Sequence, residues 1–234
     1  MLRRGVPFIS LALALAACSG SSTPKAAVNP PADVLADLAA QGTSAVYTAT
    51  YAFHQVSPDT SAAVKVWRAE PSLRVDVVAG STTATLLLTS AGSYSCAMTG
   101  AKRSCLLIAN AGAPVPAPFD VAPANLFSAD LQTLATDTSA YDVRSAPSLP
   151  ASGAVPAAQC FDVSSNASSS PSPSPSPSPS PAAVPTGRYC FTSAGVLAAA
   201  KYPSGNTITL TSLETSTPSP DAFTPYAKPT PLPS

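Results

Sequence analysis

Apolar and polar residues alternate along most of the chain after residue 44, and a period of two predicts β-strands. Across Ala45–Val56, Tyr47, Tyr51 and Phe53 lie on one side of the alternation and polar or small residues on the other. The pattern recurs between glycine, serine and proline turns at 64–68, 73–77, 83–89, 92–98, 104–108, 141–146, 158–163, 188–192, 196–202 and 207–213. Sequential hairpins of this kind predict an antiparallel sheet.

Two segments have the spacing of a helix instead. Residues 33–40 and 123–135 each place apolar side chains on one stripe, and Gly42 is the expected stop of the first helix. The stripes consist of Val34, Leu35 and Leu38, and of Leu126, Phe127, Leu131 and Leu134. An apolar stripe needs a surface to cover. The sequence therefore predicts an α+β fold, a curved antiparallel sheet (a half-open β-barrel) with two or more helices on its concave side.

Length and charge limit the domain count and the partners. A chain of 234 residues with 45% hydrophobic content is sufficient for one core, and we expect a monomeric domain over residues 32–226. Charged residues make up only 10% of the chain and are balanced, 12 basic against 12 acidic. Nucleic acid is therefore not an expected partner, since its phosphates require a basic surface.

The first eighteen residues have the composition of an export signal. Arg3 and Arg4 precede a short apolar run that is too short to span a bilayer, and the run ends in Leu15-Ala16-Ala17-Cys18. This tetrapeptide resembles the bacterial lipobox, which implies a signal peptide at 1–17 and a diacylglycerol and palmitate anchor on Cys18. Residues 18–31 would form a tether, with the domain lipid-anchored at the extracytoplasmic face of the cell membrane. An ordinary secretory signal is the alternative.

The other four cysteines form two pairs that are local in sequence, Cys96 with Cys105 and Cys160 with Cys190. An even number of cysteines in an exported domain indicates disulfides. Three connectivities are possible, and the local one is favoured because each pair lies on two strand-like runs joined by turn-forming residues. A four-thiolate metal site is the other alternative, but no C-x-x-C spacing is present.

Residues 164–185 have a composition that cannot form a core. They include a strict Ser-Pro alternation from Ser170 to Pro181, and proline removes backbone donors and favours polyproline II. We expect a disordered insertion in a surface loop, either a tolerated repeat expansion or a spacer or glycosylated stalk. A second disordered segment is expected at 227–234.

The order of segments along the chain resembles a known superfamily. Val64–Val77 consists of a strand, a turn with Arg68, Pro71, Leu73 and Arg74, and a second strand. This segment, the later strands and the closing segment Asp221–Pro225 together resemble the lipoprotein-carrier-like superfamily of the LolA, LppX and LprG type. That superfamily includes periplasmic lipoprotein carriers, an envelope-stress sensor and lipid-binding lipoproteins. The resemblance implies a half-barrel that binds lipid or lipoprotein acyl chains.

Residues for catalysis are scarce. The one histidine, His54, lies near the end of a predicted strand without a triad-like neighbourhood, and no serine lies in Gly-x-Ser-x-Gly. The P-loop and dinucleotide fingerprints are absent from the sequence. We therefore expect no enzyme activity, no cofactor and no catalytic or metal-binding residues.

Binding is the predicted function. We expect a lipid-anchored envelope lipoprotein that binds or carries a hydrophobic or amphiphilic ligand. The alternative is a sensory or regulatory lipoprotein that acts on a membrane protein partner. The candidate cavity residues would equally well form an ordinary closed core, and the sequence does not fix which sheet face is inward. These residues are Tyr47, Tyr51, Phe53, Val66, Val75, Val77, Leu86, Leu88, Leu126, Phe127 and Leu131.

Overall fold

The structure is a computed structural model, and it describes residues 30–116, 119, 123–166 and 185–231. The predicted signal peptide, Cys18 and the Ser-Pro alternation lie outside these residues. The helical elements are α1 (Pro31–Ser44), η2 (Leu126–Asp130, a π-helical turn), α2 (Leu131–Thr136) and the 3₁₀ turn η3 (Pro220–Phe223). The strands are β1 (Tyr47–Gln55), β2 (Thr60–Ala69), β3 (Ser72–Ala79), β4 (Thr82–Thr89), β5 (Gly92–Thr99), β6 (Lys102–Asn110), β7 (Tyr141–Leu149), β8 (Ala158–Ser165), β9 (Gly187–Thr192), β10 (Leu197–Lys201), β11 (Thr207–Glu214) and β12 (Thr230–Pro231).

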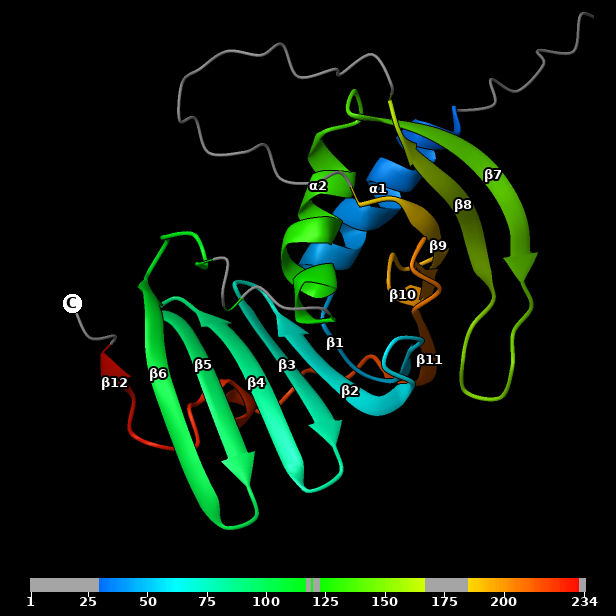
Figure 1. The fold of residues 1–234 in the computed structure, drawn as a ribbon. Coiled ribbons are helices and arrows are strands. Elements are labelled where there is room, and N and C mark those ends of the chain that lie inside the picture. Colours follow the sequence, from blue (N-terminus) through cyan, green and yellow to red (C-terminus); the bar gives the residue numbers. More distant parts are fainter. Residues whose placement is uncertain (1–29, 117–118, 120–122, 167–184, 232–234) are drawn as a thin grey trace, which may run out of the picture.

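The strands form one sheet of twelve strands in the order β12-β6-β5-β4-β3-β2-β1-β11-β10-β9-β8-β7. Neighbours are antiparallel, except that β12 runs parallel to β6. The sheet curves but does not close, so that β7 and the β6–β12 pair are its two ends (Figure 1). The α+β class and the half-open sheet predicted from the sequence are confirmed.

One face of the sheet carries the core. Tyr51 lies opposite Val64 in β2, and Val64 lies opposite Val77 in β3, so the apolar positions of successive strands line up across the sheet. The helices pack on this face: the Tyr51 and Phe127 rings have centroids 5.0 Å apart. Leu35 of α1 also belongs to this core and is fully buried. The two amphipathic helices therefore cover the sheet, as their apolar stripes require.

Helix α1 packs against the β9–β10 turn, backbone to backbone. A Cβ on Gly42 would lie 2.2 Å from the carbonyl oxygen of Gly195, and a Cβ on Gly195 would lie 2.4 Å from the carbonyl oxygen of Leu38. Gly195 also has φ +75°, which favours glycine. Gly42 was expected to end the helix, but α1 continues to Ser44. The missing side chain of Gly42 therefore allows close packing, and it does not end the helix.

The opposite face of the sheet carries two disulfides. Cys96 lies directly opposite Cys105 in the β5–β6 hairpin, with an S–S distance of 2.07 Å. Cys160 lies directly opposite Cys190 in β8 and β9, with an S–S distance of 2.04 Å. These are the local pairs that the sequence favours. Each disulfide links two neighbouring strands on the side away from the helices.

Residues 215–231, which we call the C-terminal strap, cross this opposite face from β11 towards β6 (Figure 1). Arg74 of β3 donates from Nη1 to the Ala222 carbonyl oxygen at 3.0 Å. Its Nε and Nη2 also donate to the Asp76 carboxylate, each at 2.8 Å. Asp76 is buried, and it also accepts from Thr85 Oγ1 at 2.8 Å. The strap thus covers an ion pair on this face of the sheet.

The end of the strap corrects the prediction of a disordered tail at 227–234. Thr230 and Pro231 pair in parallel with Leu106 and Leu107 of β6, so the chain is ordered to residue 231. The physical reason is that β6 ends the sheet and offers unpaired backbone groups, which a polar, proline-containing segment can use without a hydrophobic core. Residues 232–234 lie outside the described part.

Candidate binding groove

Eight of the eleven predicted cavity residues lie on the helix-covered face of the sheet, and Leu126, Phe127 and Leu131 lie on η2 and α2, which pack against it. Nine of the eleven are at most 7% exposed, and Val77 and Leu88 are partly buried against the same core. Close packing of this kind is the ordinary condition of a protein interior. In this structure these side chains pack against one another and against the helices.

An open groove of about 400 Å³ lies at one border of this core. Its walls come from the end of α1, the β2–β3 turn, β3, β4, and the η2–α2 segment. The lining residues are Thr43, Ser44, Arg68, Glu70, Pro71, Leu73, Leu88, Phe127, Ser128, Ala129 and Gln132. Leu88 and Phe127 are thus the predicted cavity residues that border it.

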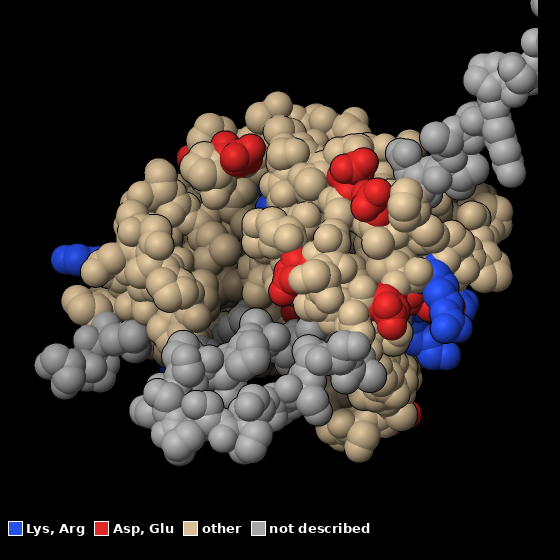
Figure 2. All heavy atoms as spheres, turned by 90° about the horizontal axis from the view of Figure 1, so that it is seen from above, with Lys and Arg blue, Asp and Glu red and all other residues tan. Residues whose placement is uncertain are grey.

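Seen from above, the molecule is hollowed between the β3–β6 side of the sheet and the helices (Figure 2). Most of this view is free of acidic and basic side chains, and the acidic residues that it shows are scattered. The groove has an apolar floor, with Leu73 and Phe127 buried, and its rim carries hydroxyl, amide and charged groups. Such a lining suits a ligand that is itself partly polar.

Arg68 is the most unusual residue of the groove. Its side chain is buried, with 8% exposed. Nη1 donates to the Thr43 carbonyl oxygen at 2.9 Å, and Nη2 donates to the Phe127 carbonyl oxygen. Nε has no partner in the described part of the chain, and no carboxylate pairs with the guanidinium there. One buried cation therefore links β2 to the end of α1 and to η2.

Two phenols lie near this cation. Burial raises the pKa of Tyr47, while the charge of Arg68 acts in the opposite direction. Burial also raises the pKa of Tyr51 well above its usual value. Both side chains stay neutral at physiological pH, because the raised pKa values lie further from it than that of a free tyrosine. They therefore supply no counter-charge to Arg68.

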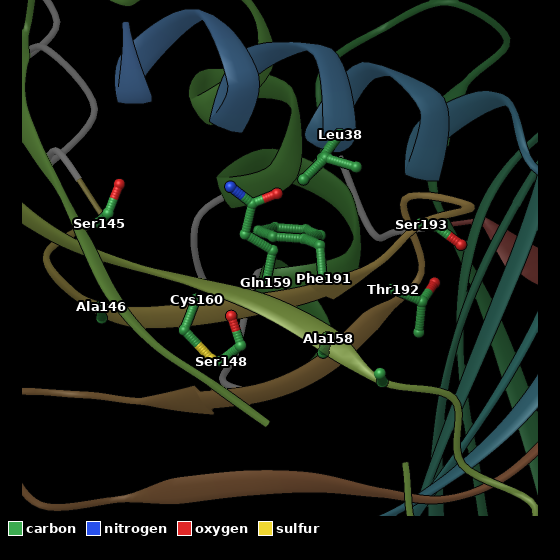
Figure 3. Close-up of a pocket in the computed structure, with 11 residues that line it drawn as sticks. Leu38, Ser145, Ala146, Ser148, Ala158, Gln159, Cys160, Phe191, Thr192 and Ser193 are labelled. Atoms are coloured by element: carbon green, nitrogen blue, oxygen red, sulfur yellow. The ribbon is translucent and has the colours of Figure 1, made fainter. Parts of the chain in front are cut away.

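A second pocket, of about 390 Å³, lies near the other end of the sheet. A β-bulge between Ala146 and Leu149 separates β7 from β8 beside it. Figure 3 shows Gln159 and Phe191 on the sheet beneath Leu38 of α1. Among the described residues, the lining of this pocket holds serine, threonine and glutamine but no titratable side chain for acid–base chemistry.

The groups that could support catalysis lie elsewhere and apart. His54 Nδ1 is 3.6 Å from the Asp59 carboxylate at the exposed end of β1, with side chains 48% and 85% exposed. Among the described residues, no three His, Cys, Asp or Glu side chains gather as a metal site would require. None of the helices in that same part of the chain is long and apolar enough to cross a membrane.

Comparisons with known proteins give structural likeness only. No family model matches the sequence, and no curated protein matches it. The complex of MucA and MucB from Pseudomonas aeruginosa has 13% sequence identity and a TM-score of 0.48, with 83% of this chain covered. MucB alone has 14% identity and a TM-score of 0.42. This chain spans only 60% of the length of the first of these neighbours.

Proposed function

We propose that this protein is a non-enzymatic envelope protein that binds a protein partner at the groove, in a sensory or regulatory role. Anchoring by a lipid on Cys18, at the extracytoplasmic face of the membrane, is part of the proposal, and it places the groove near membrane proteins. One observation carries it: the groove is open, with an apolar floor and a polar rim on fixed elements.

The lining favours a peptide segment over an acyl chain. An acyl chain gains about 0.8 kcal/mol for each buried methylene, and it gains this only against apolar walls. The groove instead brings Arg68, Glu70 and Gln132 beside Leu73 and Phe127. A peptide can place an apolar side chain on the floor while its backbone bonds to the rim.

Photo-crosslinking tests the groove directly. We expect a photo-reactive phenylalanine at Gln132, which is exposed and lines the groove, to give one discrete adduct in membranes from the native host. The matched control is the same residue at Thr136, which is exposed one turn further along α2 and is not among the groove residues. Mass spectrometry of the adduct identifies the partner. Equal adducts from both positions, or none from Gln132, would contradict the proposal.

A second candidate function is amphiphile binding, which the helix-covered face favours. Tyr47, Val66 and Val75 form a continuous apolar surface beneath the helices. If α1 and η2 moved away from the sheet, this surface could shield acyl chains. Arg68 opposes such a movement, because it bonds to backbone carbonyls of both elements.

Native mass spectrometry of detergent-free protein tests this second function. If the protein carries amphiphiles, we expect the native mass to exceed the denatured mass by that of a lipid. Arg68→Met, which frees α1 and η2, should raise the bound fraction several-fold. Arg68→Lys is the control, because a lysine keeps the charge and one carbonyl contact. Identical native and denatured masses in all three proteins would exclude this function.

A further inference from the structure

Strand β7 is the last strand of the sheet, and its outer edge has no partner strand in the described part of the chain. Its run Tyr141–Ala146 pairs regularly with β8 on the inner side, up to the bulge that begins after Ala146. An unpaired edge presents backbone N–H and C=O groups to any strand of suitable register. The edge is therefore a place where another chain can add to the sheet.

One hydrogen bond fixes which backbone groups of β7 point outward. Asn166 N–H donates to the Ala140 carbonyl oxygen at 3.1 Å, so residue 140 points its backbone groups towards β8. In an antiparallel ladder these directions alternate along the strand. Tyr141, Val143 and Ser145 therefore direct their N–H and C=O groups to the free edge.

Two charged side chains flank the centre of this edge. Asp142 and Arg144 are both exposed and, two residues apart, lie on the same face of β7. Neither takes part in an ion pair among the described residues. Asp162 lies opposite Arg144 in β8, but its carboxylate accepts from Arg188 at 2.7 and 3.0 Å. Within the described part of the chain, Arg144 thus has no ion-pair partner, although a carboxylate lies on the next strand.

We propose that β7 pairs antiparallel with β7 of a second copy of this chain, on a two-fold axis at Val143. In this register Asp142 of each copy lies opposite Arg144 of the other copy. The two-fold axis therefore creates two equivalent ion pairs. Val143 lies opposite Val143 of the other copy, and Tyr141 lies opposite Ser145 of the other copy. The backbone groups of these residues point to the free edge, so they can form the hydrogen bonds between the copies. The pairing forms hydrogen bonds and ion pairs together.

The charges select this register over its neighbours. A two-fold axis at Asp142 would place the two aspartates directly opposite each other, and an axis at Arg144 would do the same for the arginines. Like charges directly opposite destabilise a strand pair. Pro147, which lacks an N–H group, and the bulge beside it limit the pairing to about six residues.

The short edge predicts a weak dimer that depends on concentration. Proteins held on a membrane by a lipid meet at a high effective concentration, which favours such pairing. The sequence predicts a monomer, whereas pairing of two β7 strands gives a dimer. The binding groove remains free in the dimer. Its strands, β2–β4, are separated from β7 by five strands, from β1 to β8, in the strand order.

Disulfide trapping of the full chain in its membrane tests the register. In the proposed pair the two Val143 Cα atoms lie about 5.5 Å apart, within the range that a disulfide spans. We expect Val143→Cys to give a species of twice the mass under mild oxidation. Ser145→Cys is the control, because its two copies are offset by about 13 Å along the strands, at about 3.3 Å per residue. Equal trapping of both variants, or an adduct with a different protein, would overturn the proposal.

Charge reversal tests the ion pairs in the Val143→Cys background. Asp142→Arg should reduce trapping at least several-fold. The new arginine would lie opposite Arg144 of the other copy, so both ion pairs become repulsive. Adding Arg144→Asp should restore trapping, because the pair is then reversed but intact. Thermal unfolding of each variant separates a loss of pairing from a loss of fold. If Asp142→Arg leaves trapping unchanged in a folded protein, the second copy does not use this register.

Discussion

Replacing Gly42 by alanine is expected to destabilise the protein by about 3 kcal/mol, the upper end of the usual cost of overpacking. The new Cβ would lie 2.2 Å from the carbonyl oxygen of Gly195, and a backbone atom cannot move aside as a flexible side chain can. Helix α1 would have to shift away from the β9–β10 turn. Chemical denaturation with urea measures the change in the free energy of unfolding.

The sign of this effect makes it diagnostic. At an unconstrained site inside a helix, changing glycine to alanine stabilises by about 0.5–1 kcal/mol. Ala40→Gly is the matched control, because Ala40 is an exposed residue of the same helix, and we expect it to cost about 1 kcal/mol. A stabilised Gly42→Ala variant would show that α1 does not pack backbone to backbone against the turn.

The same helix affects the groove. Thr43, which follows Gly42, offers its carbonyl oxygen to Arg68. A shift of α1 by even 1 Å would lengthen this 2.9 Å bond beyond hydrogen-bonding distance. We therefore expect Gly42→Ala also to weaken the crosslink from Gln132, by changing the groove that Thr43 and Arg68 line together.

Strand positions were predictable from the sequence because their signal is local. The alternation in 45–56 and in the later runs marks β1–β11 to within a few residues, since period two needs only near neighbours. The register of β8 and β9 follows from the disulfide. If Cys160 lies opposite Cys190, Phe161 must lie opposite Tyr189, as the structure shows. Turn residues such as Gly100 define the ends of the strands.

The distinction between cavity and core was not predictable. Tyr51 and Val66 would look the same in sequence whether they faced an acyl chain or a helix, because both surroundings are apolar. The placement of Phe127, with its ring centroid 5.0 Å from that of Tyr51, is visible only in the fold. That placement depends on residues 76 positions apart in the chain.

Arg68 and the C-terminal strap depend on long-range contacts for the same reason. The basic residue before Pro71 is visible in the sequence, but its acceptors are backbone carbonyls of α1 and η2, which any residue would provide. Likewise, Arg74 bonds to the carbonyl oxygen of Ala222, far along the chain. Backbone acceptors carry no signal in the sequence, so such contacts require the fold to be known.

Removing the Cys160–Cys190 disulfide, by changing both cysteines to alanine, is expected to lower the free energy of unfolding by about 4 kcal/mol. The bridge joins residues 30 positions apart. In the chain-entropy account a disulfide stabilises by restricting the unfolded chain, and a longer loop gives a larger effect. The loop includes the Ser-Pro alternation, so the disulfide brings β8 and β9 together across this insertion. Urea denaturation of oxidised protein provides the measurement.

The second disulfide is the natural control. Cys96 and Cys105 are only 9 positions apart, so the same account predicts a loss of about 3 kcal/mol when both become alanine. Both bridges lie between directly opposite strand residues with Cα–Cα distances of 4.0 Å, so their settings in the folded sheet are closely matched. A larger loss from the short loop would contradict the account. It would mean that the disulfide stabilises the β5–β6 hairpin more than it stabilises the interrupted β8–β9 pair.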